Sequence, residues 1–428
     1  MKILPAKKIE GSLKVPGDKS ISHRAVILGS IARGITEIHN ISPCEDCSCT
    51  ISAIKKMGIE FSSSEKGTII IKGKGLEGLS EPKEILDLGN SGTSMRLLSG
   101  VLSAQPFFSV LTGDQYLLKR PMDRVIIPLS QMGAKILGRS NNRFAPLAIK
   151  GEKLNPINYI MPVPSAQVKS AILLAGIFTE GVTAVTETFP TRDHTEIMLS
   201  SFGGKISSSE GTVTVQGRSK LEGAKIFIPS DISSAAFFLV AASILKDSEI
   251  TVKDVGVNPT RTGVVDILKK MGSKIDISNI SSKNGEIIGD ISASTSSLKG
   301  ISIGGEIVPR TIDEFPIIFI AAAMAEGVTY VTGIKELRVK ESDRIAAMAK
   351  GLREMGIKVK EGEGEITIEG KGNFKGARIS SSGDHRIAMA FSIAALAADS
   401  ETYIDDIKCI DTSFPGFLEA LDKVAVRN

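Results

Sequence analysis

One sequence motif occurs five times along this 428-residue chain. In each copy a segment with helical periodicity ends in Met or Phe followed by Gly, and a short strand comes next. The copies are AIKKMGIEF, LSQMGAKI, LSSFGGKI, LKKMGSKI and LREMGIKV, and successive Met/Phe-Gly pairs are 75, 70, 69 and 84 residues apart. Such spacing indicates a structural repeat, which restricts the chain to a fold assembled from similar units.

The repeat also predicts how the chain divides into domains. Several copies continue with an alternating strand and a polar Gly turn, as in GTIIIKGKGLEG and GTVTVQGRSKLEG. A sixth unit is expected to end with a helix over residues 417–424, so the chain predicts an α/β protein with two domains of three units. The segment FIPSDISS at 227–234 contains a proline and a helix start, which favours a crossover there. We expect residues 15–229 to form the N-terminal lobe, and residues 1–14 with 230–428 to form the C-terminal lobe.

Composition excludes several classes of function. The longest apolar stretches, 235–245 and 317–325, are shorter than the roughly 20 residues that cross a bilayer, so they predict buried helices. No secretory signal pattern opens the sequence. The formal charge of +4 is small and Trp is absent, so a nucleic-acid partner is not indicated. We therefore expect a cytoplasmic protein without a membrane or nucleic-acid partner.

The cysteines do not match a metal site. Cys44, Cys47 and Cys49 follow His39, but structural zinc sites usually come as two separated pairs, and Cys409 is far away in the sequence. The sequence predicts no metal here and favours free thiols in a reducing compartment.

Five predicted helices begin with small or polar residues, in GDKSISHRA, LGNSGTSMRLL, PSAQVKSAILL, PSDISSAAFFL and SGDHRIAMAF. Helix N-termini bind anions through unpaired backbone N–H groups and the helix dipole. Ordinary capping explains the small residues without a ligand, but it does not explain the cations that accompany these starts. Those cations are Lys19, Arg24, Arg96, Lys169 and Arg386.

The segment ELRVKESDR places two cations and a carboxylate at another predicted helix start. At helical spacing Lys340 and Arg344 share one face, and Glu341 lies three residues before Arg344. A phosphate or carboxylate substrate fits such a turn. A solvated, salt-bridged face is the alternative interpretation.

Nine motifs follow one another over nearly the whole chain: GDKSISHR, LGNSGTSMR, LKRPMDR, PSAQVKSA, TRDHTE, IDEFP, RVKESDR, GDHR and TSFPGF. Together they resemble the 5-enolpyruvylshikimate-3-phosphate synthase (3-phosphoshikimate 1-carboxyvinyltransferase) family. The resemblance implies a two-domain inside-out α/β barrel, with three βαβαββ units per domain and the active site in the cleft between them. It also implies a monomer without a cofactor, which acts in the shikimate pathway of aromatic amino acid biosynthesis.

The implied substrates are shikimate 3-phosphate and phosphoenolpyruvate. For shikimate 3-phosphate, the resemblance implies contacts from Lys19, Ser20, Arg24, Ser165, Ala166, Gln167, Arg192, Asp313 and Lys340. Ser20 could instead be a simple helix cap. Arg192 belongs to TRDHTE, which is similar to a subgroup of the family in which this arginine takes the shikimate phosphate.

For phosphoenolpyruvate, the resemblance implies contacts from Lys19, Gly92, Arg120, Gln167, Arg344 and Arg386. Planar guanidinium groups suit its phosphate and carboxylate, and a glycine lets a ligand approach the backbone closely. Glyphosate is expected to compete with phosphoenolpyruvate.

Asp313, Glu341 and Lys19 are the implied catalytic residues. The 5-hydroxyl of shikimate 3-phosphate loses its proton to Asp313 and attacks C2 of phosphoenolpyruvate, while C3 gains a proton from Glu341. Phosphate then leaves, and Lys19 stabilises charge. The adjacent Glu314 is an alternative to Asp313, because the sequence does not show which carboxylate faces the site.

The chain departs from the family pattern at two places. Ala166 stands where many members have Ser, which removes one expected hydrogen bond. Asp411, Thr412 and Ser413 stand where many members have a Lys before the terminal Phe-Pro motif, so an expected cation is missing.

Two other functions remain as alternatives. The enolpyruvyl transferase acting on UDP-N-acetylglucosamine shares the fold but uses a loop Cys as acid, and this chain has no Cys between Thr50 and Lys408. A non-catalytic anion-binding protein of the same fold would tolerate loss of Asp313 and Glu341.

Overall fold

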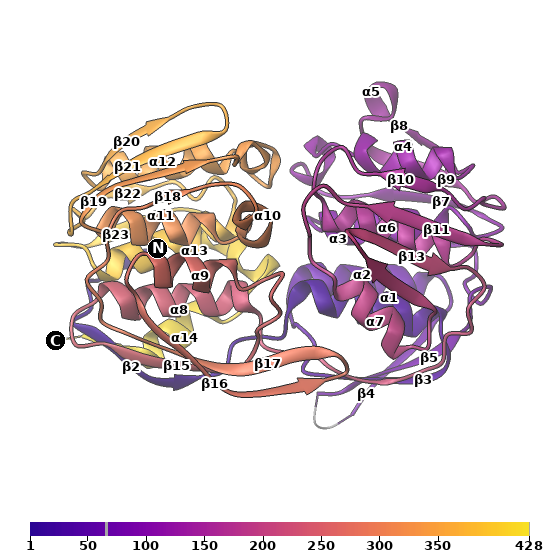
Figure 1. Ribbon diagram of the computed structural model, residues 1–428, viewed down its shortest axis with the longest axis horizontal. Helices are drawn as coiled ribbons and strands as arrows, with labels where there is room; N and C mark the ends of the chain where they lie inside the picture. The colour runs from indigo at the N-terminus through magenta and orange to yellow at the C-terminus, as the bar shows by residue number, and fades with distance from the viewer. Residues whose placement is uncertain (65–66, 428) are drawn as a thin grey trace. The chain divides into compact units, whose positions relative to one another are not determined.

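The computed structural model describes residues 1–64 and 67–427 (Figure 1). The chain divides into two compact units. Unit 1 consists of Met1–Pro16, Pro229–Ser281 and the chain from Ile287 onward, and unit 2 consists of Gly17–Ile228 with Ser282–Glu286. Each unit has its own hydrophobic core.

Within its described residues, unit 2 contains three four-stranded sheets, with strand orders β14-β3-β5-β4, β6-β7-β9-β8 and β10-β11-β13-β12. The strands are β3 (Arg33–His39), β4 (Glu60–Ser63), β5 (Ile69–Lys74), β6 (Leu86–Asp87), β7 (Phe108–Thr112), β8 (Lys135–Gly138), β9 (Phe144–Lys150), β10 (Asn158–Ile160), β11 (Val182–Thr186), β12 (Ile206–Ser209), β13 (Thr212–Gln216) and β14 (Lys225–Phe227).

The described part of unit 1 also has three sheets, ordered β16-β17-β15-β2-β24, β18-β19-β21-β20 and β1-β23-β22. The strands are β1 (Lys2–Ile3), β2 (Lys8–Leu13), β15 (Glu249–Gly256), β16 (Lys274–Lys283), β17 (Glu286–Ser294), β18 (Ser302–Ile303), β19 (Gly327–Thr332), β20 (Lys358–Glu361), β21 (Glu365–Gly370), β22 (Arg378–Ile379), β23 (Thr402–Ile404) and β24 (Ala425–Val426).

Among the described residues, four of the six sheets share one pairing pattern. In β14-β3-β5-β4 the first pair is parallel and the next two pairs are antiparallel. The sheets that begin with β6, β10 and β18 repeat this pattern. In unit 1, β2 pairs in parallel with β15, which pairs antiparallel with β17. The sequence repeat therefore corresponds to a repeated sheet unit.

The helices of unit 2 are α1 (Lys19–Ile31), α2 (Glu45–Lys56), α3 (Gly92–Leu102), η1 (Leu117–Lys119), α4 (Asp123–Gln131), α5 (Arg139–Asn142), α6 (Ala166–Gly176) and α7 (His194–Ser201). Those of unit 1 are α8 (Ile232–Ile244), α9 (Gly263–Lys270), α10 (Ile307–Thr311), α11 (Phe315–Met324), η2 (Lys335–Val339), α12 (Arg344–Glu354), α13 (His385–Leu396), η3 (Ile407–Thr412) and α14 (Phe417–Val424).

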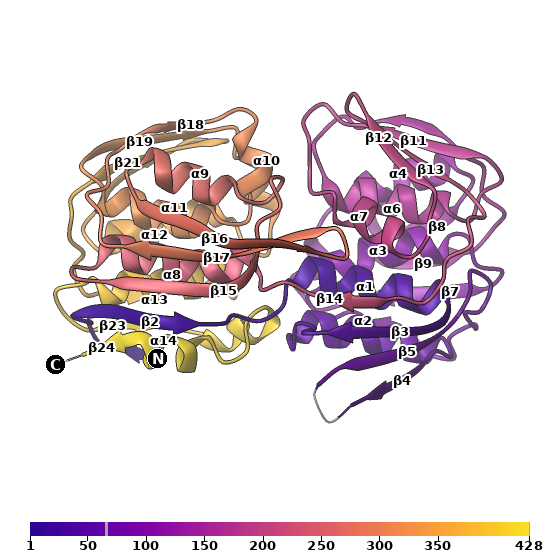
Figure 2. The same ribbon diagram turned by 60° about the horizontal axis from the view of Figure 1, so that its bottom comes forward.

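Three helices form the centre of each unit, and nearly all of their residues are buried. In unit 2, α3 packs against α1 and α6, and in unit 1 each of α8, α11 and α13 packs against the other two. The strands of each unit lie around its helices (Figure 2). The apolar stretches at 235–245 and 317–325 fall on α8 and α11, and both helices are buried as predicted. Among residues 1–64 and 67–427, no helix is long and apolar enough to cross a membrane.

The repeated Met/Phe-Gly pairs end five helices in the same way. Their apolar residues are the C-cap residues of α2, α4, α7, α9 and α12, and all five are buried. The following glycines all have positive φ, between 84° and 100°: Gly58, Gly133, Gly203, Gly272 and Gly356. A left-handed residue after the last turn stops a helix, and glycine adopts that conformation without a Cβ clash. The predicted helix stops are therefore confirmed.

Candidate active site

The predicted site residues fall into two groups on the chain. Unit 2 contains Lys19, Ser20, Arg24, Gly92, Arg120, Ser165, Ala166, Gln167 and Arg192. Unit 1 contains Asp313, Lys340, Glu341, Arg344 and Arg386. A cleft that joins the two groups stays a prediction, and the geometry of each group is given separately below.

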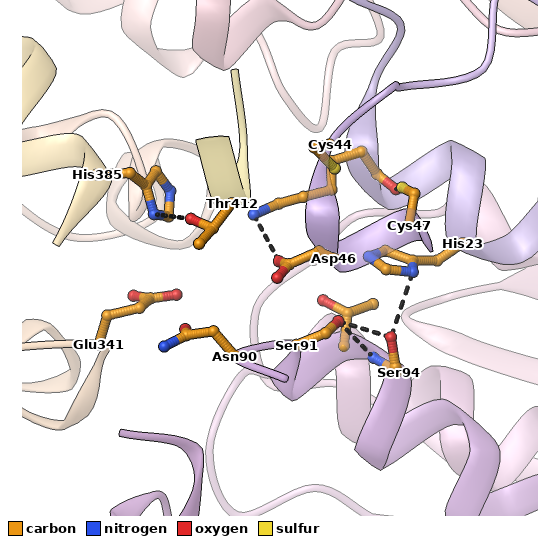
Figure 3. Close-up of polar contacts among 12 residues, drawn as sticks. His23, Cys44, Asp46, Cys47, Asn90, Ser91, Ser94, Glu341, His385 and Thr412 are labelled. Atoms are coloured by element: carbon orange, nitrogen blue, oxygen red, sulfur yellow. Dashed lines mark hydrogen bonds and ion pairs between the residues drawn. The ribbon is translucent and has the colours of Figure 1, made fainter. Parts of the chain in front are cut away.

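The first turn of α1 places Lys19 next to a carboxylate. Asp18, not Ser20, is the N-cap of α1, since its Oδ1 accepts the backbone N–H of Ile21 at 2.9 Å. Lys19 Nζ lies 2.9 Å from Asp46 Oδ2, and both side chains are mostly buried (Figure 3). Asp46 thus fixes the position of the lysine that is predicted to contact both substrates.

Arg24 is buried one turn further along α1. Its guanidinium donates to Thr195 Oγ1 and Ser170 Oγ, both at 2.7 Å, and to the Ser20 carbonyl at 2.8 Å. Burial lowers the pKa of Arg24 to about 10, and the positive charge of Arg192, which precedes α7, acts in the same direction. Two arginines that repel each other favour a bound anion.

Gly92 lies against the guanidinium of Arg120. Gly92 is the first residue of α3, which Ser91 caps by accepting the N–H of Ser94. A Cβ at Gly92 would lie 2.5 Å from NH1 of Arg120, and the Arg120 side chain is buried. Glycine is therefore required for this close approach.

The start of α6 is tied to α3 by a side-chain amide. Ser165 caps α6, and Ala166, its first residue, offers no side-chain hydrogen bond. Gln167 donates from Nε2 to Thr93 Oγ1 at 2.8 Å, and its Oε1 accepts a hydrogen bond from Arg96. Both polar atoms of Gln167 therefore have protein partners that fix the orientation of the amide.

In unit 1 the Asp313 carboxylate lies beside two cations. Asp313 Oδ1 is 3.6 Å from Lys340 Nζ and 3.5 Å from NH1 of Arg344. Glu341 Oε2 is 2.6 Å from NH2 of Arg344, and NH1 of Arg386 donates to the Asp313 carbonyl at 2.9 Å. The five predicted residues of this unit are therefore one cluster.

Glu314, the alternative to Asp313, has a different environment. Its side chain is buried, accepts a hydrogen bond from Ser233 Oγ, and lies 3.6 Å from NH2 of Arg261. Asp313 is therefore the carboxylate that faces the cation cluster, and Glu314 is part of a separate buried network.

Sequence reasoning missed Asp384, which organises this cluster. Asp384 caps α13 by accepting the N–H of Arg386 at 2.9 Å, and its Oδ2 lies 2.8 Å from Nε of Arg344. Burial opposes the charge of Arg344, but Asp384 and the neighbouring carboxylates outweigh that effect and raise its pKa. The available signal was the acidic residue in GDHR, directly before a helix.

The prediction that KESDR forms one helical turn is wrong. α12 begins only at Arg344, with Asp343 as its N-cap, and Lys340 follows the short helix η2. Lys340 and Glu341 therefore lie on the connection before the helix. They converge on Asp313 and Arg344 because this connection brings them there, not because they share a helix face.

The segment that lacks the expected Lys lies against α13. Thr412, the last residue of η3, places its Oγ1 3.3 Å from His385 Nδ1 (Figure 3). His385 is buried at the first position of α13. The segment that lacks the expected Lys therefore places a neutral hydroxyl, that of Thr412, beside His385. Lys408, on the same short helix, is exposed.

Sequence reasoning also missed a buried series of polar contacts that links α1, α2 and α3. His23 Nδ1 lies 2.8 Å from Thr50 Oγ1, which lies 2.5 Å from Ser94 Oγ, and Ser94 donates to Ser91 at 2.6 Å (Figure 3). Burial lowers the pKa of His23 to about 3, and the charges of Lys19 and Arg24 act in the same direction. His23 is therefore neutral at pH 7.

The four cysteines are free, and Cys44 and Cys47 are buried. Cys44 is the N-cap residue of α2. Among the described residues, no group of three or more His, Cys, Asp and Glu side chains is placed to hold a metal ion.

The solved structures most informative for the architecture are enolpyruvyl-transferring enzymes. An EPSP synthase from Acinetobacter baumannii matches with a TM-score of 0.88 and 48% identity, over 100% of this chain and 98% of that one. The enolpyruvyl transferase NikO from Streptomyces tendae matches with a TM-score of 0.79 at 16% identity, over 99% of this chain and 96% of that one. The architecture is thus the enolpyruvyl transferase fold, and the predicted fold class is confirmed.

Sequence comparison defines the family. The profile of the EPSP synthase (3-phosphoshikimate 1-carboxyvinyltransferase) family matches residues 3–421. A 3-phosphoshikimate 1-carboxyvinyltransferase of Pelotomaculum thermopropionicum is 52% identical over 422 residues, which is 98% of each chain. One of Geobacter sulfurreducens is 52% identical over 423 residues, or 99% of this chain and 98% of its own. The chain belongs to the EPSP synthase family, and the predicted family is confirmed.

Proposed function

We propose that this chain transfers the enolpyruvyl group of phosphoenolpyruvate to the 5-hydroxyl of shikimate 3-phosphate and releases phosphate. Its family membership supports this reaction. The observation that carries the chemical assignment is the cluster of unit 1, where Asp313 and Glu341 lie beside Lys340 and Arg344. Two carboxylates held among cations provide a base, an acid and charge stabilisation in one place.

The proposed reaction is addition followed by elimination. Asp313 takes the proton of the 5-hydroxyl as its oxygen attacks C2 of phosphoenolpyruvate, and Glu341 supplies the proton that C3 gains. Glu341 then takes back a C3 proton as phosphate leaves, which restores the C2=C3 double bond and gives the enol ether product. Anionic substrates compete with the ion pairs of Lys340 and Arg344, and this competition frees the carboxylates for proton transfer.

We assign the phosphate of shikimate 3-phosphate to the arginine pair of unit 2. Arg24 donates hydrogen bonds to two hydroxyl oxygens and a carbonyl oxygen, and Arg192 adds a second positive charge nearby. Ser20, Ser165 and Gln167 are the proposed neutral contacts to the same substrate. Ala166 offers no hydrogen bond there.

We assign phosphoenolpyruvate to Lys19, Gly92, Arg120, Gln167, Arg344 and Arg386. These residues come from both units, so the proposal requires that the two lobes close on the substrates. The proposed enzyme is a cytoplasmic monomer that needs no metal or cofactor and binds neither nucleic acid nor membrane. Glyphosate should compete with phosphoenolpyruvate for the same residues.

The test is an assay of phosphate release from phosphoenolpyruvate, with shikimate 3-phosphate present or omitted. Release should depend strictly on both compounds, and UDP-N-acetylglucosamine should not replace shikimate 3-phosphate. Asp313→Ala, Glu341→Ala and Lys19→Ala should each lower turnover by about 10² to 10⁴ while the chain stays folded. The exposed Asp276 on β16 offers a matched control, and Asp276→Ala should act like the unchanged chain. Normal turnover in all three site variants would refute the roles assigned to these residues, whereas no phosphate release by the unchanged chain would favour a non-catalytic anion-binding protein.

A further inference from the structure

The TRDHTE segment at the start of α7 is held by hydrogen bonds and an ion pair to α1 and α6 of unit 2. Thr195 Oγ1 lies 2.7 Å from both Arg24 Nε and Ser170 Oγ. Lys169, whose side chain is 1% exposed, lies 2.6 Å from Glu196 Oε1. Arg24 belongs to α1, and Ser170 and Lys169 belong to α6. These contacts hold the body of the segment in place.

A further contact to this segment comes from a distant part of the sequence. His194 Nδ1 lies 2.7 Å from Oε1 of Glu286, which is 92 residues later, and the two side chains are only 2% and 5% exposed. Glu286 is the first residue of β17. It belongs to the segment Ser282–Glu286 at the tip of the β16–β17 hairpin, which is part of unit 2, whereas the rest of the hairpin belongs to unit 1.

The turn that precedes Glu286 is itself fixed. Asn284 accepts the backbone N–H of Phe227 at 2.9 Å and donates from Nδ2 to the Lys225 carbonyl at 2.7 Å. A Cβ at Gly285 would lie 2.9 Å from Cγ2 of Ile197, so the turn packs closely on α7. The position of Glu286 is therefore set by the turn and does not depend on His194 alone.

We propose that Glu286 is a positioning residue for shikimate 3-phosphate, which acts through His194 to hold Arg192 where it meets the phosphate. The inference rests on the proposed function. Arg192 is two residues before His194, and its charge repels that of Arg24. This repulsion opposes the placement of Arg192 near Arg24. The buried pair of His194 and Glu286 resists this effect, so the phosphate finds the two arginines already placed.

The experiment measures steady-state kinetics for Glu286→Ala and Glu286→Gln. Glu286→Ala should raise the KM for shikimate 3-phosphate about tenfold. Its kcat and its KM for phosphoenolpyruvate should stay within about twofold, since Glu286 acts only on the contact to the phosphate. Glu286→Gln keeps an oxygen that accepts the His194 N–H, so it should recover most of the affinity.

A double-mutant cycle separates positioning from general structural support. In an Arg192→Ala background, Glu286→Ala should have almost no further effect on the KM for shikimate 3-phosphate, because the residue that it positions is gone. Equal effects of Glu286→Ala in the presence and absence of Arg192 would overturn the inference. An unchanged KM for shikimate 3-phosphate in Glu286→Ala would overturn it as well.

Lys283, the last residue of β16, provides a control in the same segment. Its Nζ lies 3.9 Å from the ring centre of Phe227, and Lys283→Ala should leave both KM values unchanged. If Glu286→Ala does not fold, the same cycle with Glu286→Asp, which shortens the reach to His194, replaces it. Absence of phosphate release by the unchanged chain would refute the proposed function. Normal release together with an additive cycle would refute only the role of Glu286.

Discussion

The two units hold their central arginines in different ways. In unit 2 Arg24 donates hydrogen bonds to two hydroxyls and a carbonyl, and the pKa of Arg24 is lowered to about 10, chiefly by burial. In unit 1 the fully buried Arg344 contacts the carboxylates of Asp384, Glu341 and Asp313, and its pKa is raised despite burial.

The different partners of Arg24 and Arg344 suit the two arginines to different tasks. An arginine whose partners are neutral keeps its attraction for an external anion, which suits binding of a phosphate. An arginine surrounded by carboxylates has its charge compensated and instead holds those carboxylates in position, which suits proton transfer. We therefore attribute substrate anchoring mainly to unit 2 and acid-base chemistry mainly to unit 1.

The largest expected effect on stability comes from Asp384. Asp384→Ala removes a fully buried carboxylate from Arg344 and the cap of α13, so the free energy of unfolding should fall by about 3 kcal/mol or more. Denaturant titration measures this value. A loss below about 1 kcal/mol would mean that the carboxylates do not compensate Arg344 as described.

Gly92→Ala should have the next largest effect. The new methyl group would lie 2.5 Å from NH1 of Arg120, so the guanidinium must move. We expect a loss of stability of about 1–3 kcal/mol and a higher KM for phosphoenolpyruvate. The KM for shikimate 3-phosphate should change less. Unchanged KM values would show that Arg120 does not need its position against α3.

The buried His23 of unit 2 should make the free energy of unfolding depend on pH. Its pKa is lowered to about 3 in the folded protein from an ordinary 6.5, so the unfolded chain binds the proton first. Its contribution to stability is therefore complete above about pH 6.5 and is lost as the pH falls toward 3. At pH 5 this loss is about 2 kcal/mol, and His23→Gln should remove that part of the slope between pH 7 and 5. Parallel stability curves for the two proteins would contradict the buried, neutral His23.

Ser170→Ala should have the smallest effect and is the counterpart of Asp384→Ala. It removes a hydroxyl that contacts Arg24 and Thr195, and the expected loss of stability is about 1 kcal/mol. Chemical denaturation of both variants tests the comparison directly. If Ser170→Ala were as destabilising as Asp384→Ala, the distinction between neutral and charged partners would fail.

Local sequence patterns predicted the fold well because the repeated motif determines where helices end through interactions between neighbouring residues. A buried Met or Phe followed by a left-handed glycine ends a helix wherever it occurs, and five copies fixed five helix ends. The start of α12 was misplaced because the preference of Asp343 for the N-cap position outweighed the helical spacing of Lys340 and Arg344.

Contacts between distant residues could not be read in the same way. Glu286 looks like an ordinary residue between a turn and a strand, and only the fold brings it to His194. Glu314 and Asp313 are adjacent in sequence, yet one meets Arg261 and the other meets Lys340. Which neighbour a carboxylate finds depends on how separate elements pack, and a single sequence contains no direct record of that packing.

The most direct test of the separation of tasks compares Arg24→Lys with Asp313→Asn. Calorimetric titration gives the Kd for shikimate 3-phosphate, and phosphate release gives the turnover. We expect Arg24→Lys to weaken binding about tenfold, because an ammonium group cannot replace the guanidinium fork. Asp313→Asn should keep most of the affinity and lose turnover by about 10² or more. Full turnover by Asp313→Asn, or unweakened binding by Arg24→Lys, would contradict the account.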